Sequence, residues 1–216
     1  MAQSTDAASS TCVRRLVHFA HSWLDFRIPE LRAVAAVTNI SLSVDEADEA
    51  ALRVGSEGVL LPVRFGCGTD EEVASIVERA VLVRHVIDEW ANGSTWDELK
   101  ASFASCAGEK AAPFLSKGAT YRVRVQAFGL SYSEAEQLDL IKSLVTLLPP
   151  HYARVRLKQP QHRLLLIVEA VAEAGQRTVR FSFGRVVARG ARDLVVKYDL
   201  KQRNYIGTTS LDAEVA

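Results

Sequence analysis

Arginine and lysine recur at alternate positions in the second half of the sequence, which is the pattern of a charged strand face. Two sets alternate with apolar residues: Arg122 and Arg124 in 121–128, and Arg154, Arg156 and Lys158 in 154–159. Alternate residues of a strand point to the same side of a sheet. Guanidinium groups bind phosphates through paired hydrogen bonds and stack on unpaired bases. The pattern therefore indicates a surface for RNA, although a solvated sheet face shows the same alternation.

The charges divide unevenly along the chain. Residues 1–116 contain 10 Lys+Arg and 17 Asp+Glu, a net charge of −7, whereas residues 117–216 contain 16 and 9, a net charge of +7. A basic half points to an anionic partner, with nucleic acid as the leading class. The alternative is that the two halves attract each other and the charge joins them.

Two other groups of residues suggest chemistry but lack its full pattern. Gly66 and Gly68 stand between an expected strand and an expected helix, as in nucleotide-binding turns, but the helix opens on three acidic residues that would repel a phosphate. His18 and His21 lie near Asp25 without the spacing of a metal-binding helix. We interpret the first as a tight turn and the histidines as structural.

No other catalytic or metal-binding pattern is present. The three cysteines, Cys12, Cys67 and Cys106, are widely spaced and form no Cys-x-x-Cys pair, so we expect reduced thiols and no zinc. The first eleven residues are small and polar, which predicts a disordered tail (residues 1–12) rather than a signal peptide. With no apolar run near ~20 residues, we expect a cytoplasmic protein.

Periodicity and capping signals predict a mixed α/β fold. We expect helices at 28–37, from Thr69 through Trp90, from Thr95 to about residue 106, and at 133–148. A linker is expected at 107–118, which places a domain boundary there. The expected strands are 16–20, 59–65, 121–128, 154–159, 164–168, 178–188 and 193–200.

Three segments resemble the front half of the eukaryotic and archaeal tRNA (guanine(10)-N(2))-methyltransferase catalytic subunit. They are LVHFAHSWLDFRIPEL (16–31), LVRHVIDEWANGSTWDEL (82–99) and FGRVVARGARDLVVKYDLKQRNYIGTTSLDAE (183–214). The resemblance implies an N-terminal ferredoxin-like domain at 13–106 and a THUMP RNA-binding domain at 107–192. It also adds Arg185 and Arg192 to the expected RNA contacts, and it implies tRNA as the partner.

In that family the segment matching YIGTTSLDAE leads into a methyltransferase domain that binds S-adenosylmethionine. The resemblance thus implies that residues 193–216 begin that domain, with Thr209, Ser210 and Asp212 bordering the cofactor if it follows. Departures from the family pattern are Thr208, where proline is frequent, and Leu211, where methionine is usual.

The family's glycine-rich cofactor loop and Asp-Pro-Pro-Tyr motif do not occur in these 216 residues. We therefore expect no cofactor on this chain and no catalysis by it alone. The family's small zinc-binding activator subunit is expected only for a full-length enzyme. The expected function is to bind tRNA for methylation at guanosine 10; the alternative is a stand-alone THUMP-type RNA-binding or regulatory protein.

Overall fold

The computed structural model describes residues 13–46, 60–67, 69–148, 153–173 and 176–199. The elements of the first half are β1 (Val13–Phe19), the 3-10 helix η1 (Leu24–Phe26), α1 (Arg27–Val37), β2 (Leu42–Ser43), β3 (Leu60–Phe65), α3 (Asp70–Val77) and β4 (Val83–Gly93). Those of the second half are α4 (Trp96–Lys110), η2 (Ala112–Phe114), β5 (Thr120–Phe128), α5 (Glu134–Leu147), β6 (Arg154–Val155), β7 (His162–Glu173), β8 (Gln176–Arg189) and α6 (Arg192–Lys197).

All described strands join one mixed sheet, in the order β2-β3-β1-β4-β8-β7-β5-β6. The first four strands pair antiparallel, and with α1 and α3 they form the β-α-β-β-α-β arrangement of a ferredoxin-like fold. In the second half β5 runs parallel to β6 and β7, and β8 returns antiparallel to β7. The mixed α/β class that the sequence predicts is confirmed.

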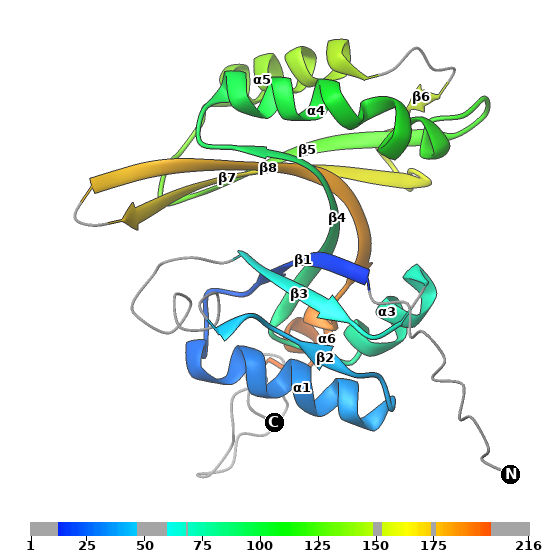
Figure 1. Ribbon diagram of the computed structural model, residues 1–216, viewed down its shortest axis with the longest axis vertical. Coiled ribbons are helices and arrows are strands. Elements are labelled where there is room, and N and C mark those ends of the chain that lie inside the picture. Colours follow the sequence, from blue (N-terminus) through cyan, green and yellow to red (C-terminus); the bar gives the residue numbers. More distant parts are fainter. Residues whose placement is uncertain (1–12, 47–59, 68, 149–152, 174–175, 200–216) are drawn as a thin grey trace, which may run out of the picture.

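The sheet bends sharply, so that its two halves face each other. β1 and β5 lie four strand positions apart in the sheet, which would separate them by roughly 19 Å if the sheet were flat. Yet the ring centroids of His18 on β1 and Phe128 on β5 are 5.0 Å apart. Figure 1 shows the bend carried by β4 and β8, with α4 and α5 above the upper half and α1 below the lower half. The inner angle of this bend is called the crease below.

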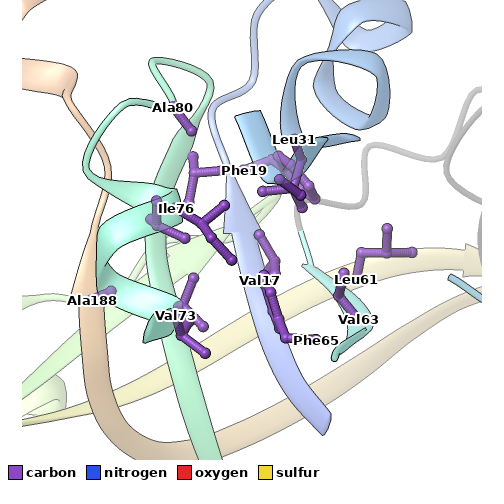
Figure 2. Packing of buried hydrophobic residues seen from close by; sticks show 14 of the residues in the cluster. Val17, Phe19, Leu31, Leu61, Val63, Phe65, Val73, Ile76, Ala80 and Ala188 are labelled. Carbon is purple, nitrogen blue, oxygen red and sulfur yellow. The ribbon is translucent and has the colours of Figure 1, made fainter. Parts of the chain in front are cut away.

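The described residues form three buried clusters. One lies in the first half, where Val17 and Phe65 of the strands pack against Leu31 and Ile76 of the helices (Figure 2). The second lies under α4 and α5 and centres on stacked aromatic rings, among them Trp90. The third lines the crease with Leu16, Leu60, Ile87, Leu165 and Ile167. These five residues belong to β1, β3, β4 and β7, so strands of both halves of the sheet contribute to this cluster.

The helix predicted from Thr69 through Trp90 is wrong beyond Val77. The capping box of Thr69 and Glu72 is present, but Val83–Gly93 forms β4. Two irregularities in its pairing with β8 reset the strand alternation, so Val83, Val86 and Trp90 are buried at a helix-like spacing. A bulged strand therefore has the same apolar spacing as a helix.

Three smaller corrections concern the second half. Residues 107–118 are not an open linker, because α4 continues to Lys110 and Leu115 is buried in the second cluster. The strand expected at 154–159 is only two residues long. The strand expected at 193–200 is the helix α6 as far as Lys197, and β4 and β7 already occupy both edges of the preceding strand β8. The domain boundaries themselves stay a prediction.

Candidate nucleic-acid interface

Four arginines converge on a small hollow beside the crease. The hollow has a volume of about 110 Å³, and its lining includes Arg122 and Arg124 of β5, Arg163 of β7, Arg189 of β8 and His85 of β4. Strand register brings them together, since Arg122 is level with Arg163 and His85 is level with Arg189. This set of residues is called the arginine hollow below. Two of them, Arg122 and Arg124, are predicted RNA contacts.

The described part of the chain places no acidic side chain in the lining of the arginine hollow. Within the part of the chain that the structure describes, no carboxylate lies within 4.0 Å of the guanidinium groups of Arg124, Arg163 or Arg189. Burial and then repulsion from these three arginines lower the pKa of Arg122. Such a site favours an anion.

Polar atoms inside the hollow lack partners. Arg122 donates from Nη1 to the carbonyl oxygen of Leu157 at 2.8 Å, which holds its guanidinium in place. Its Nε and the Oε1 of Gln126 are buried without a hydrogen-bond partner. Buried polar groups are normally hydrogen-bonded, so these two atoms are exceptions among the residues that line the hollow.

A basic strip borders the hollow at the sheet edge. It consists of Arg154, Arg156 and Lys158, whose side chains are exposed. Thr120 pairs with Arg154, so Arg154 shares the face of Arg122, whereas Lys158 lies beyond the two-residue strand β6. The hydrogen bond from Arg122 to Leu157 joins the strip to the hollow. The sequence prediction that these three basic residues contact RNA from one face stays a prediction.

Arg185 and Arg192 lie outside the hollow. Arg185 is 8% exposed, forms ion pairs with Asp70 and Asp88, and its guanidinium carbon lies 3.8 Å from the centroid of the Phe114 ring. Arg192 donates from Nη1 to the carbonyl oxygen of Val81 at 3.3 Å. Their assignment as RNA contacts stays a prediction, and these contacts give both of them a role within the fold.

Asp70 explains the acidic start of the helix after the glycine turn. It lies 3.0 Å from Arg15 and also binds Arg185, which links β1, α3 and β8. Burial alone would raise the pKa of Asp70, but the hydrogen bonds from Arg185 and Arg15 outweigh it and lower the pKa. At Gly66 a Cβ atom would meet Ser41 Oγ at 1.8 Å. These contacts agree with a structural turn.

His18 and His85 form a pair behind the hollow. Their Nδ1 atoms are 3.2 Å apart, and His18 is fully buried. Burial and then His85 lower the pKa of His18 to about 3. Burial lowers the pKa of His85, and repulsion from nearby arginines, with Arg189 first among them, lowers it further to about 4. His18 is therefore a neutral structural residue, and no group of three metal-ligating side chains occurs among the described residues.

We expect the free energy of unfolding to fall as the pH drops below 6.5. The unfolded chain binds protons at His18 and His85 near their ordinary pKa of 6.5, whereas the folded chain does not until about pH 4. Below pH 6.5 each of these histidines therefore lowers the free energy of unfolding by up to about 1.4 kcal/mol per pH unit. His162, whose pKa burial lowers, acts in the same direction. Urea unfolding at about pH 7.5 and about pH 5.5 measures the change.

The matched control for this effect is His85→Gln, which keeps a polar side chain but does not titrate. Its stability should depend less steeply on pH than that of the unmodified chain. Glu30 opposes the trend, because burial raises the pKa of its carboxyl group, and it does so equally in both proteins. Equal pH dependence of the two proteins would contradict the role of His85.

Sequence reasoning placed Arg163 and Arg189 among the cations near the basic face but not among its expected RNA contacts, and it did not select His85 or Gln126. His85 stands within the segment predicted as a helix, so no local pattern marks it, whereas Gln126 continues the alternation of Arg122 and Arg124. Only pairing between distant strands brings them to one hollow. Thr209, Ser210 and Asp212 lie outside the described residues. Among the described helices, none is long and apolar enough to span a membrane.

A family model described as "Tmrp11 THUMP N-terminal domain" matches residues 13–192. Among curated relatives, the tRNA (guanine(10)-N(2))-methyltransferase TRMT11 of Rattus norvegicus is 27% identical over 208 residues, covering 93% of this chain and 42% of that protein. TRMT11 of Homo sapiens is 27% identical over 211 residues, covering 96% and 43%. The chain thus spans less than half the length of these relatives.

Among solved structures, PH1313 from Pyrococcus horikoshii is similar over 82% of this chain and 55% of its own. The sequence identity is 11% and the TM-score is 0.44.

Proposed function

Because the chain belongs to the family of Tmrp11 THUMP N-terminal domains, we propose that it binds tRNA for an S-adenosylmethionine-dependent methyltransferase that modifies guanosine 10. In this proposal residues 13–106 form the ferredoxin-like domain and residues 107–192 the THUMP domain, and the protein acts in the cytoplasm. The cofactor and the activator subunit belong to the longer enzyme, because the chain spans less than half of its relatives.

The observation that carries the proposal is the arginine hollow with its adjoining basic strip. Four guanidinium groups converge there without a carboxylate in the lining, although a solvated protein surface normally mixes charges of both signs. The strip continues the positive charge along the sheet edge, where its exposed side chains can contact a nucleic-acid backbone. Phosphates are the ligands that such fixed guanidinium groups bind best.

We expect the 216-residue chain to bind tRNA with a strong dependence on salt. Neutralising each phosphate contributes about 0.7 to 0.9 to the slope of log affinity against log salt concentration. If the hollow and the strip both bind RNA, the slope should exceed about 3 in magnitude. Filter binding of labelled tRNA over a series of salt concentrations gives the slope. Absence of tRNA binding at low salt would overturn the proposed function.

Charge reversal in the strip tests its share of the interface. The variant Arg154→Glu/Arg156→Glu removes two exposed cations that belong to none of the three buried clusters. It should weaken tRNA binding about tenfold or more and flatten the salt slope by roughly 1.5. Thermal unfolding should be unchanged. Unaltered tRNA affinity would exclude the strip from the interface.

A further inference from the structure

His85 connects the arginine hollow to the buried ring of His18. It is half-buried on β4 and lines the hollow. Its Nδ1 atom lies 3.2 Å from Nδ1 of His18, which is a hydrogen-bond distance. This contact occupies Nδ1 and leaves Nε2 for a ligand in the hollow, because no residue of the described part of the chain forms a hydrogen bond with Nε2.

The two histidines share one proton between their Nδ1 atoms when both rings are neutral. A neutral imidazole carries a single N–H, so only one of the two Nδ1 atoms donates to the other. When His85 is the donor, its Nε2 carries no proton and repels a phosphate oxygen. A second proton makes both nitrogens of His85 donors and gives the ring a positive charge. Its Nδ1 then donates to His18, and its Nε2 donates to an anion in the hollow.

The surroundings of His85 keep it neutral in the free chain. Burial lowers the pKa of its ring, and arginine repulsion lowers the pKa further. A bound anion offsets the repulsion from the arginines, and it accepts a hydrogen bond from the charged ring. A negative charge close to a histidine favours the protonated form. An anion in the hollow therefore raises the pKa of His85 towards its ordinary value.

The charged groups that face His85 come from every strand packed around it. Among the described residues they are His18 of β1, Arg84 of β4, Arg189 of β8, Arg163 of β7, and Arg122 and Arg124 of β5. Further back, Arg27 of α1 acts on His18, and Glu169 of β7 acts on Arg27. None of the groups that act directly on His85 is acidic, so a bound anion supplies the negative charge that the ring lacks.

Resting on the proposed function, we propose that binding of an RNA phosphate at the arginine hollow is coupled to the uptake of one proton from solvent by His85. The coupling is reciprocal, because the phosphate favours the protonated ring and the protonated ring favours the phosphate. The affinity for tRNA therefore rises as the pH falls through the range in which His85 of the complex titrates. The low pH that destabilises the free chain thus strengthens its complex with RNA.

The first test measures tRNA affinity of the full chain by filter binding at about pH 7.5 and about pH 5.5, at one low salt concentration. If the pKa of His85 in the complex returns to its ordinary 6.5, the affinity rises by up to about tenfold over this interval. His85→Gln should lose this gain. The matched control His162→Gln removes a histidine outside the hollow and should keep it. Thermal unfolding at both pH values checks that each protein is folded.

The second test counts protons directly and needs no variant. Isothermal titration calorimetry at about pH 6, in two buffers with different protonation enthalpies, should show uptake of up to about 0.7 proton per bound chain. No uptake, or an equal pH dependence of affinity in His85→Gln and the unmodified chain, would overturn this proposal and leave the proposed function intact. Absence of tRNA binding at low salt at both pH values would instead overturn the proposed function.

Discussion

Reversing the charge of Arg124 and Arg163 together is expected to weaken tRNA binding by at least about a hundredfold. Both line the arginine hollow, and neither has an acidic partner among the described residues. Each charge-assisted hydrogen bond contributes roughly 1.5–3 kcal/mol, and about 1.4 kcal/mol corresponds to tenfold in affinity. The new carboxylates also repel phosphate. Filter binding of labelled tRNA at fixed low salt measures the loss.

The matched control for this double variant is Arg14→Glu/Arg79→Glu. It changes the net charge equally, and both side chains are exposed in the first half, away from the hollow. It should lower tRNA affinity only through the change in net charge, by a few-fold at low salt. If both double variants weaken binding equally, the hollow is not the site and the protein binds tRNA by overall charge.

Arg185→Ala and Arg189→Ala are expected to have opposite effects, although the two residues lie four apart on β8. Arg185 is buried, holds Asp70 and Asp88, and stacks on Phe114. Its loss leaves Arg15 as the remaining ion-pair partner of those carboxylates among the described residues. Removing one partner from a buried charge network costs about 3–5 kcal/mol. Urea unfolding should show this loss of stability.

Arg189 is exposed and lines the hollow, so its removal should leave the free energy of unfolding nearly unchanged. The tRNA affinity of the Arg189→Ala variant should fall by about tenfold. For Arg185→Ala, tRNA affinity measured below the unfolding transition should stay near that of the unmodified chain. A large loss of affinity with unchanged stability in Arg185→Ala would instead establish Arg185 as an RNA contact.

Local signals in the sequence determined several elements correctly. The capping boxes at Thr69 and Ser133 and the cap at Thr95 each begin a helix, because a side chain there satisfies a backbone N–H group within the first turn. The alternation of apolar and polar residues that begins at Tyr121 and Arg122 predicts a strand, and β5 forms there. The basic character of the second half likewise follows from composition alone, because the number of charged residues does not depend on the fold.

Tertiary structure decided what local signals could not. Val83–Gly93 has a helical apolar spacing, yet β1 and β8 supply partners on both edges, and their hydrogen bonds override that spacing. The same pairing curves the sheet and brings His85 and Arg189 beside Arg122 and Arg163. The sequence by itself thus determined that this half is basic and where its helices begin. The hollow exists only in the folded sheet, because strand register brings residues that are far apart in the chain around one hollow.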